Sequence, residues 1–224
     1  GRSMLIRFSY SVTGPVKFLS HLDLLKYFCK AVKRADIPIA YSEGFNPHPK
    51  IAFGPPRGVA IAGLNEYCDM KLKTEMTAEE FAEKFNSALP KGIRINSARV
   101  VTGKAKPLQA VINRAEYEAE ITGGDLLSMP EKISDLLKAE NIEIIRRNPK
   151  KGNKTINLRS GIESLDWQGD EKSGVLRMSL IFGAGGSVKP TEVVKYLTDD
   201  KGKCVIVRTG LFVVDEKNGK RKLP

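Results

Sequence analysis

The chain has 224 residues, and its 37 basic and 26 acidic side chains give a net charge of +11. That length suits one large domain or two small domains of roughly 100 residues each. A hydrophobic share of 41% is enough for packed cores and excludes a globally disordered chain. No apolar run reaches the roughly 20 residues of a membrane-crossing helix, so we expect a cytoplasmic protein without membrane association. The charge favours a polyanionic partner, nucleic acid first, although surplus lysines can also serve solubility alone.

The first hundred residues alternate between strand and helix patterns. A strand is predicted at residues 5–12, where apolar and polar side chains alternate. Ser20 followed by Asp23, and later Thr77 followed by Glu80, have the spacing that begins a helix. Three further strands are predicted at residues 51–53, 67–72 and 93–101. The resulting order βαββαβ is that of a ferredoxin-like domain.

The same pattern begins again after a linker at residues 102–107. Helices are predicted from Ser128, with a proline in the first turn, and from Pro190. Strands are predicted at residues 117–121, 142–145, 176–182, 204–208 and 211–214. This half repeats βαββαβ with a long insertion between Asn148 and Ser173. We therefore predict an α+β chain of two tandem ferredoxin-like domains, residues 4–101 and 108–216.

The cysteines and histidines give no metal-binding pattern. No CxxC occurs, so no local motif can hold an iron–sulfur cluster or a structural zinc ion. The two histidines match no known ligand spacing, and we expect neither a metal nor a cofactor. All three cysteines are expected to be buried as small apolar side chains: Cys29, Cys68 and Cys204.

The segment Tyr41–Gly58 has the composition of a shaped loop. Proline fixes φ and glycine permits positive φ, and an aromatic, a histidine and a lysine sit on that frame. An aromatic ring that stacks a base beside cations that meet phosphate is what single-stranded RNA binding requires. The alternative is a structural loop in which the histidine bonds backbone and the aromatic ring packs inward. The candidate ligand-binding residues of this segment are Tyr41, Ser42, Phe45, Asn46, His48, Lys50 and Arg57.

The two histidines are also the candidate catalytic residues. His21 is predicted in the first turn of a helix, where backbone N–H groups favour anions. If it converges with His48, either could act as a general base, with Lys50 or Arg57 stabilising developing phosphate charge. The sequence shows no dyad, so we favour a protein without catalytic activity of its own.

A second candidate segment, residues 146–159, holds six basic residues and no acid. Insertions between strands project as hairpins, and a basic tip would raise affinity for phosphate without sequence preference. The alternative is a solvated loop. Its basic residues are Arg146, Arg147, Lys150, Lys151, Lys154 and Arg159. A glycine-rich turn at residues 183–186 lacks the complete phosphate-binding patterns and is predicted to be a flexible connection.

Four stretches carry a family resemblance: residues 18–25 (FLSHLDLL), 39–50 (IAYSEGFNPHPK), 66–69 (EYCD) and 208–212 (RTGLF). Together they resemble the radical-SAM-linked protein family, a bacterial domain of unknown function found beside or fused to cobalamin-binding radical SAM enzymes. The second half departs from it at residues 157–161, where an Asp-Leu-Arg-Pro type of segment is expected. The resemblance implies an accessory partner of a radical SAM enzyme with a link to RNA or ribosome biology. Without cluster-binding cysteines, the chain is not expected to be that enzyme.

Three functions compete. We predict an RNA-binding or substrate-presenting accessory protein of a radical SAM enzyme. The alternative is an RNA-processing enzyme, an endoribonuclease or a pseudouridine-synthase-like protein, that uses His48 or His21. A third possibility is a structural adaptor that binds a protein partner, and not RNA, through the segment Tyr41–Gly58.

Overall fold

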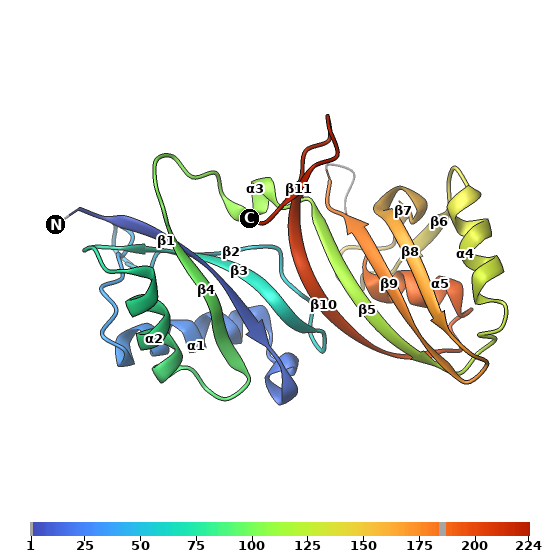
Figure 1. Ribbon diagram of the computed structural model, residues 1–224, viewed down its shortest axis with the longest axis horizontal. Coiled ribbons are helices and arrows are strands. Elements are labelled where there is room, and N and C mark those ends of the chain that lie inside the picture. Colours follow the sequence, from blue (N-terminus) through green and yellow to red (C-terminus); the bar gives the residue numbers. More distant parts are fainter. Residues whose placement is uncertain (1, 184–186) are drawn as a thin grey trace. The chain divides into compact units, whose positions relative to one another are not determined.

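The computed structural model describes residues 2–183 and 187–224, which contain five α-helices and eleven β-strands of an α+β fold. The chain divides into two compact units (Figure 1). The first unit comprises residues 1–112 and 210–224, and the second unit comprises residues 113–209. The predicted glycine-rich turn lies partly outside the described residues, because residues 184–186 are not among them.

The first unit is an antiparallel sheet covered by two helices. Strand β1 lies between β3 and β4, and β2 pairs with β3. Figure 1 shows α1 and α2 on the same face of this sheet. The order βαββαβ predicted for residues 4–101 is confirmed. Its elements are β1 (Met4–Val12), α1 (His21–Arg34), β2 (Ile51–Phe53), β3 (Ala62–Leu72), α2 (Ala78–Ala88) and β4 (Ile93–Val101). Smaller elements are the 3-10 helix η1 (Gly14–Phe18), α3 (Leu108–Val111) and β11 (Arg221–Lys222).

Both helices of the first unit begin at the predicted N-caps. The Ser20 hydroxyl accepts a hydrogen bond from the Asp23 N–H at 3.1 Å, and the Thr77 hydroxyl accepts one from the Glu80 N–H at 3.1 Å. Each cap satisfies a backbone donor that the first turn leaves without a partner. The core beneath the helices is rich in aromatic rings, and burying each is worth about 1.5 to 3 kcal/mol. Four of these rings are almost completely buried: Phe8, Phe28, Phe81 and Phe85.

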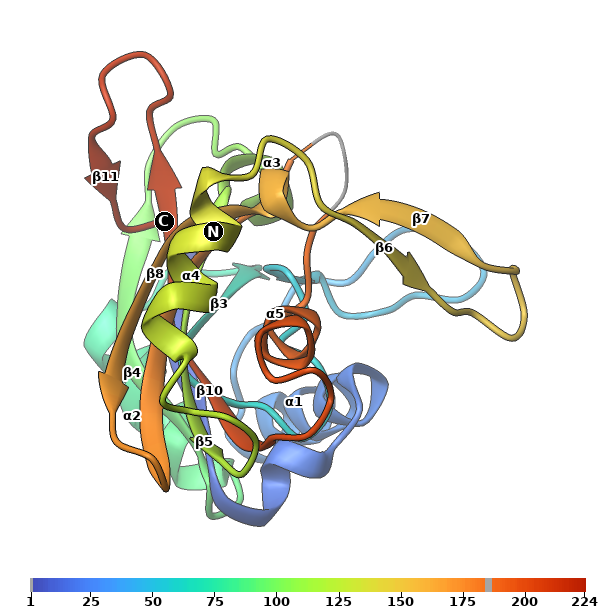
Figure 2. The same cartoon turned by 90° about the vertical axis from the view of Figure 1, so that its right-hand side faces the viewer.

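The second unit combines a four-stranded sheet with a separate hairpin. The sheet order is β10-β5-β9-β8, and β6 pairs only with β7 in a two-stranded sheet. The elements are β5 (Arg114–Thr122), α4 (Met129–Lys138), β6 (Glu143–Arg146), β7 (Lys154–Asn157), the 3-10 helix η2 (Arg159–Gly161), β8 (Ile162–Gly169), β9 (Ser173–Ile181), α5 (Pro190–Leu197) and β10 (Lys203–Val214). Strand β10 contributes residues to both units. Figure 2 shows β6 and β7 as an arm that extends away from α4 and α5.

The sequence prediction differs from the structure in the insertion of the second unit. The sequence predicts residues 142–145 as the second strand of the sheet, whereas that position beside β9 belongs to β8. Only Ile162 of β8 is buried, so its alternation is too weak to mark a strand. The segment at residues 143–146 pairs with β7 instead, because the turn at residues 147–153 brings β7 back beside it.

The cysteines also differ from the prediction. Cys68 is buried, but Cys29 is only half-buried and Cys204 is exposed. Cys204 lies between two other exposed residues at the beginning of β10. None of the helices in the described part of the chain has the length and apolar character that a membrane crossing requires.

Candidate functional site

The segment Tyr41–Lys50 of the first unit forms a closed loop. An isolated bridge joins Tyr41 to Pro49. The Ser42 N–H donates to the His48 carbonyl at 2.9 Å, and the His48 N–H donates to the Ser42 hydroxyl at 3.1 Å. The same hydroxyl lies 3.0 Å from the His48 Nδ1. These bonds fix the ends of the loop, so its tip is held without burial.

Phe45 stands at this tip and is completely exposed, with a relative accessibility of 105%. The preceding residue, Gly44, has a φ of +115°, which side-chain-bearing residues rarely adopt. Asn46 is exposed beside it. The outward direction of the Phe45 ring agrees with the binding interpretation of the loop and not with inward packing.

Three lysines lie where the base of this loop is hydrogen-bonded to the end of β3. Lys50 and Lys71 are exposed and adjacent, since the Lys71 N–H donates to the Lys50 carbonyl at 3.1 Å. The Lys73 ammonium lies 5.3 Å from the centre of the Tyr41 ring, within the range of a cation–π contact. None of the three forms an ion pair with any described residue. The loop therefore combines one exposed ring at its tip with positive charge at its base.

His21 lies in a different place, a pocket of about 200 Å³ that Arg57 and Glu66 also line. Its ring contacts that of Phe53 edge to face, with centroids 4.7 Å apart. Burial, and then the positive charge of Arg57, lower the pKa of His21 from its ordinary value of 6.5. His48 is not among the residues that line this pocket. The two candidate catalytic residues thus belong to separate sites.

The Arg57 side chain forms hydrogen bonds with backbone carbonyls. Its guanidinium donates to the carbonyls of Lys17 and Ile61 at 2.7 Å each and of Leu19 at 3.0 Å. Its side chain is buried. Arg57 therefore ties η1 to the loop after β2, and these donors are not directed at a ligand.

The basic segment of the second unit forms the hairpin β6–β7 with an ordered tip. The Asn148 side-chain oxygen accepts from the backbone N–H groups of Lys150 and Lys151 at 2.9 and 3.0 Å. The Gly152 N–H donates to the Asn148 carbonyl at 2.8 Å, and Gly152 has a φ of +82°. An Asx turn of this kind fixes the direction of the chain. The basic tip is therefore a turn closed by hydrogen bonds.

Most of the charge on this hairpin has no ion-pair partner among the described residues. Residues 143–157 contain five basic side chains and one acidic side chain, a net charge of +4. Lys154 lies directly opposite Arg146 in the register, a like-charge arrangement that is destabilising in a hairpin. Four of its cations form no ion pair with any described residue. They are Arg147, Lys150, Lys151 and Lys154.

The other two basic residues of this segment have internal partners. Arg146 donates to both carboxylate oxygens of Glu192, at 2.6 and 3.0 Å. Its Nη2 also donates to the Ser187 carbonyl at 2.9 Å. Arg159 donates to the carbonyls of Ile162 at 2.8 Å and Leu137 at 3.3 Å. These two arginines orient the hairpin and the turn after it, so the exposed charge belongs to the hairpin tip and Lys154.

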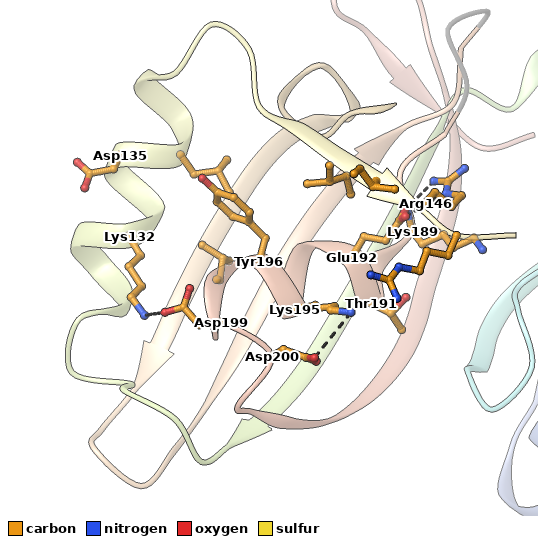
Figure 3. Close-up of a pocket in the computed structure, with 15 residues that line it drawn as sticks. Lys132, Asp135, Arg146, Lys189, Thr191, Glu192, Lys195, Tyr196, Asp199 and Asp200 are labelled. Atoms are coloured by element: carbon orange, nitrogen blue, oxygen red, sulfur yellow. Dashed lines mark hydrogen bonds and ion pairs between the residues drawn. The ribbon is translucent and has the colours of Figure 1, made fainter. Parts of the chain in front are cut away.

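A pocket of about 1030 Å³ lies beside this hairpin, between α4, β6 and α5. Figure 3 shows Tyr196 between Lys132 and Asp135 on one side and Arg146 and Lys189 on the other. Apolar side chains from all three elements contribute to the lining: Leu136, Ile144, Ile145 and Leu197. Charged side chains surround them, and Arg147 joins the pocket to the hairpin tip. The pocket thus offers apolar surface next to positive charge.

Two ion pairs fix the far side of this pocket. The Lys132 ammonium lies 3.3 Å from the Asp199 carboxylate, and the Lys195 ammonium lies 3.7 Å from the Asp200 carboxylate. Arg147 and Lys189 form no such pair with the described residues. At the hairpin end of the pocket, the charges without a close counterion among the described residues are therefore positive, whereas Asp135 on the opposite side also has no ion pair there.

No group of three or more histidine, cysteine, aspartate or glutamate side chains in residues 2–183 and 187–224 could hold a metal ion.

Sequence reasoning missed the pocket residues Lys189, Glu192 and Tyr196. The four-residue spacing of Glu192 and Tyr196 places them on one face of a helix, and a tyrosine on a polar helix face was a usable signal. The partner of Glu192 could not be found in this way, because 46 residues separate it from Arg146.

Comparisons with known proteins identify a family and some distant folds. The family model described as "Uncharacterized protein conserved in bacteria (DUF2344)" matches residues 5–190. No curated protein matches the chain. One similar solved chain comes from a Cbf5-Nop10-Gar1 complex, with 13% identity, a TM-score of 0.46, and coverage of 91% of this chain and 49% of that chain.

Two further solved structures are also remote from this chain in sequence identity and TM-score. A chain of the archaeal box H/ACA sRNP Nop10-Cbf5 complex has 13% identity and a TM-score of 0.44, covering 92% of this chain and 46% of that one. An unknown protein from Galdieria sulphuraria has 14% identity and a TM-score of 0.30, covering 92% and 99%. The chain spans about half the length of the first two matched chains. Similarities this distant do not bear on function.

Proposed function

The chain belongs to the DUF2344 family of bacterial proteins, and we propose that it is an RNA-binding accessory protein whose main phosphate contact is the hairpin β6–β7. The observation that supports this most strongly is the set of four hairpin cations without an ion-pair partner in the described part of the chain. Three of them lie in the turn and Lys154 begins β7, so like charges that repel one another are close together on one hairpin. A polyanion removes that repulsion and gains from counterion release.

The loop Tyr41–Lys50 supports a second contact. A completely exposed aromatic ring on a fixed loop can stack an unpaired base without first being ordered. Lys50, Lys71 and Lys73 supply positive charge at its base. In this proposal the loop recognises single-stranded segments, and the hairpin adds affinity that does not depend on sequence.

The fold and the partner are part of the same proposal. We infer that both units are ferredoxin-like, with the hairpin β6–β7 as an insertion in the second. The family resemblance adds a radical SAM enzyme as the partner to which RNA, or a substrate attached to RNA, is presented. Co-purification of the two proteins before and after RNase treatment would show whether the pair exists and whether RNA bridges it.

An RNA-processing enzyme has weaker support. The lowered pKa of His21 keeps the ring unprotonated at neutral pH but makes it a weaker base, and Arg57, which could have stabilised phosphate charge there, donates to backbone carbonyls. His48 lies in the exposed loop and is bonded to Ser42. Incubation of total RNA with the wild-type protein and with His21→Ala and His48→Ala variants tests this function. Cleavage that either substitution abolishes would favour the enzyme.

The binding proposal is tested by fluorescence anisotropy with a labelled single-stranded RNA at low salt. The triple variant Lys150→Glu, Lys151→Glu, Lys154→Glu removes the hairpin charge. A matched control reverses three exposed lysines of the same unit that also lack an ion pair in the described residues, Lys172, Lys201 and Lys203. We expect the hairpin variant to lose at least tenfold more affinity than the control. Equal losses would mean that only the net charge matters, and no binding by the wild-type protein would refute the proposal.

A further inference from the structure

We propose that the pocket between α4, β6 and α5 receives an unpaired nucleotide of the bound RNA, with its base stacked on Tyr196. This inference rests on the proposed RNA binding and deepens it, because it assigns a ligand class to the pocket of about 1030 Å³ beside the hairpin. It concerns the second unit alone.

The first step is the position of Tyr196. The residue lies on the last turn of α5, 43% exposed, while its neighbour Leu197 is buried. Figure 3 shows its ring in the space between α4 and the end of β6, not folded back against α5. A tyrosine ring loses little conformational entropy on binding, and its flat face accepts any base.

The second step is the apolar surface around the ring. Ile145 on β6 is 66% exposed and is among the residues that line the pocket. Ile144 lines the same space and is half-buried, while Leu136 in the same lining is buried. A nucleobase has two apolar faces and a polar edge, so the accessible isoleucine surface can contact one face while Tyr196 contacts the other. The volume of about 1030 Å³ exceeds what one nucleotide needs, which suits a base that remains attached to a chain.

The third step is charge. At the hairpin end of the pocket, Arg147 and Lys189 form no ion pair within the described residues. Three acidic groups of the lining are each held by a basic partner, namely Glu192, Asp199 and Asp200, whereas Asp135 at the α4 side has no ion pair within the described residues. The cations without a close partner thus lie between the stacking surface and the basic tip. Phosphates that flank an unpaired nucleotide would meet Arg147 and Lys189 and continue toward Lys150.

A polypeptide fits this surface less well. An acidic peptide would gain from Arg147 and Lys189, but it would bring its carboxylates close to Asp135, Asp199 and Asp200 along the other wall. An RNA chain meets those acids with the edge of a base instead, whose exocyclic amino group can donate to a carboxylate.

Photo-crosslinking of the unmodified protein tests the inference. The probe is a single-stranded oligonucleotide of ten uridines with one central 5-iodouridine, which crosslinks to aromatic rings stacked on it. We expect mass spectrometry to find the crosslink on the peptide that contains Tyr196, and excess unlabelled oligouridine to remove it. A crosslink confined to other peptides would overturn the inference.

Substitution gives an independent measurement. Tyr196→Ala should weaken the binding of single-stranded RNA by on the order of tenfold, and Tyr196→Phe should stay within about twofold. Tyr27→Ala is the matched control, because Tyr27 is a comparably exposed helix tyrosine, at 40% against 43%, outside the pocket. A duplex of the same length should be insensitive to all three changes. Equal effects of Tyr196→Ala and Tyr27→Ala would contradict the proposal.

Two further arms separate the possible failures. Competition with uridine monophosphate shows whether the site binds a free nucleotide. If micromolar uridine monophosphate displaces the oligonucleotide, the pocket is a mononucleotide site and the inference that it binds RNA is overturned. If single-stranded RNA binds with a steep salt dependence and Tyr196 has no role, the inference alone fails. If the wild-type protein binds no RNA, the proposed function fails with it.

Discussion

The Arg146 guanidinium holds both carboxylate oxygens of Glu192, with Nη2 2.6 Å from Oε1 and Nε 3.0 Å from Oε2. The same Oε1 accepts the Lys189 N–H at 2.8 Å, which caps the first turn of α5. One carboxylate therefore joins the base of the hairpin β6–β7 to the helix that carries Tyr196. The hairpin is oriented by a paired arginine, while the cations beyond it remain available.

Removal of Arg146 should loosen the hairpin. We expect Arg146→Ala to lower the free energy of unfolding by about 1 to 2 kcal/mol, because a partly buried, charge-assisted pair is lost. Hydrogen exchange should accelerate in residues 143–157 more than in β9. Arg177→Ala is the control, since its pair with Glu118 is exposed on both sides and should be worth less than about 1 kcal/mol. The same exchange pattern in both variants would contradict this role.

Acid should weaken the same contact. Burial alone would raise the pKa of Glu192, but hydrogen bonds from Arg146 and from the Lys189 N–H outweigh it and lower the pKa below the ordinary 4.5. A lowered folded-state pKa gives stability that is present above the unfolded pKa and is lost as the pH falls through the folded value. Urea unfolding at pH 7, 5, 4 and 3 should show a decline below about pH 4.5. Glu192→Gln should make that decline shallower, and an unchanged pH profile would contradict the assignment.

Phe45 should matter for binding and not for stability. The ring is completely exposed, so Phe45→Ala should leave the unfolding midpoint unchanged and weaken single-stranded RNA binding by about 5-fold or more. Phe53→Ala is the opposite case, because Phe53 is buried among the rings of Tyr10 and Phe28; it should cost about 3 to 5 kcal/mol. A large loss of stability from Phe45→Ala would show that the loop packs against something.

The Arg7–Asp69 pair predicts a stability effect in the first unit. The two side chains lie opposite each other on β1 and β3, joined by hydrogen bonds of 2.8 and 2.9 Å, and both are buried. Arg7→Ala should cost about 3 to 5 kcal/mol by leaving a buried charge unpaired. The double variant Arg7→Met, Asp69→Leu should cost much less, as urea unfolding would show. Equal costs would mean that Arg7 acts through its other contacts.

The first unit was largely predictable, because its signals are local. Ser20 and Thr77 cap their helices through hydrogen bonds three residues along the chain, and apolar and polar side chains alternate in β1 from Ile6 to Val12. The second unit was less predictable from the sequence. Strand β8 buries a single side chain at its start, and the hairpin β6–β7 depends on the Asn148 turn, whose geometry appears only in three dimensions.

The sites divide in the same way. The positions of the exposed aromatic loop and of the basic segment followed from composition, but composition could not separate structural from available cations. Arg57, Arg146 and Arg159 look like Lys150 and Lys151 in the sequence, yet their partners are distant carbonyls or a carboxylate. The pocket around Tyr196 joins three elements that no short pattern connects.

The central claim is tested most directly by the salt dependence of RNA binding. Affinity for a single-stranded RNA is measured at several salt concentrations for the wild-type protein and for the variant Lys150→Gln, Lys151→Gln, Lys154→Gln. If these lysines contact phosphates, the slope of log affinity against log salt should become shallower by about 2 in the variant. The same substitutions at Lys172, Lys201 and Lys203 should leave the slope unchanged. Equal slopes in the wild-type protein and the hairpin variant would contradict the claim that the hairpin β6–β7 binds the RNA backbone.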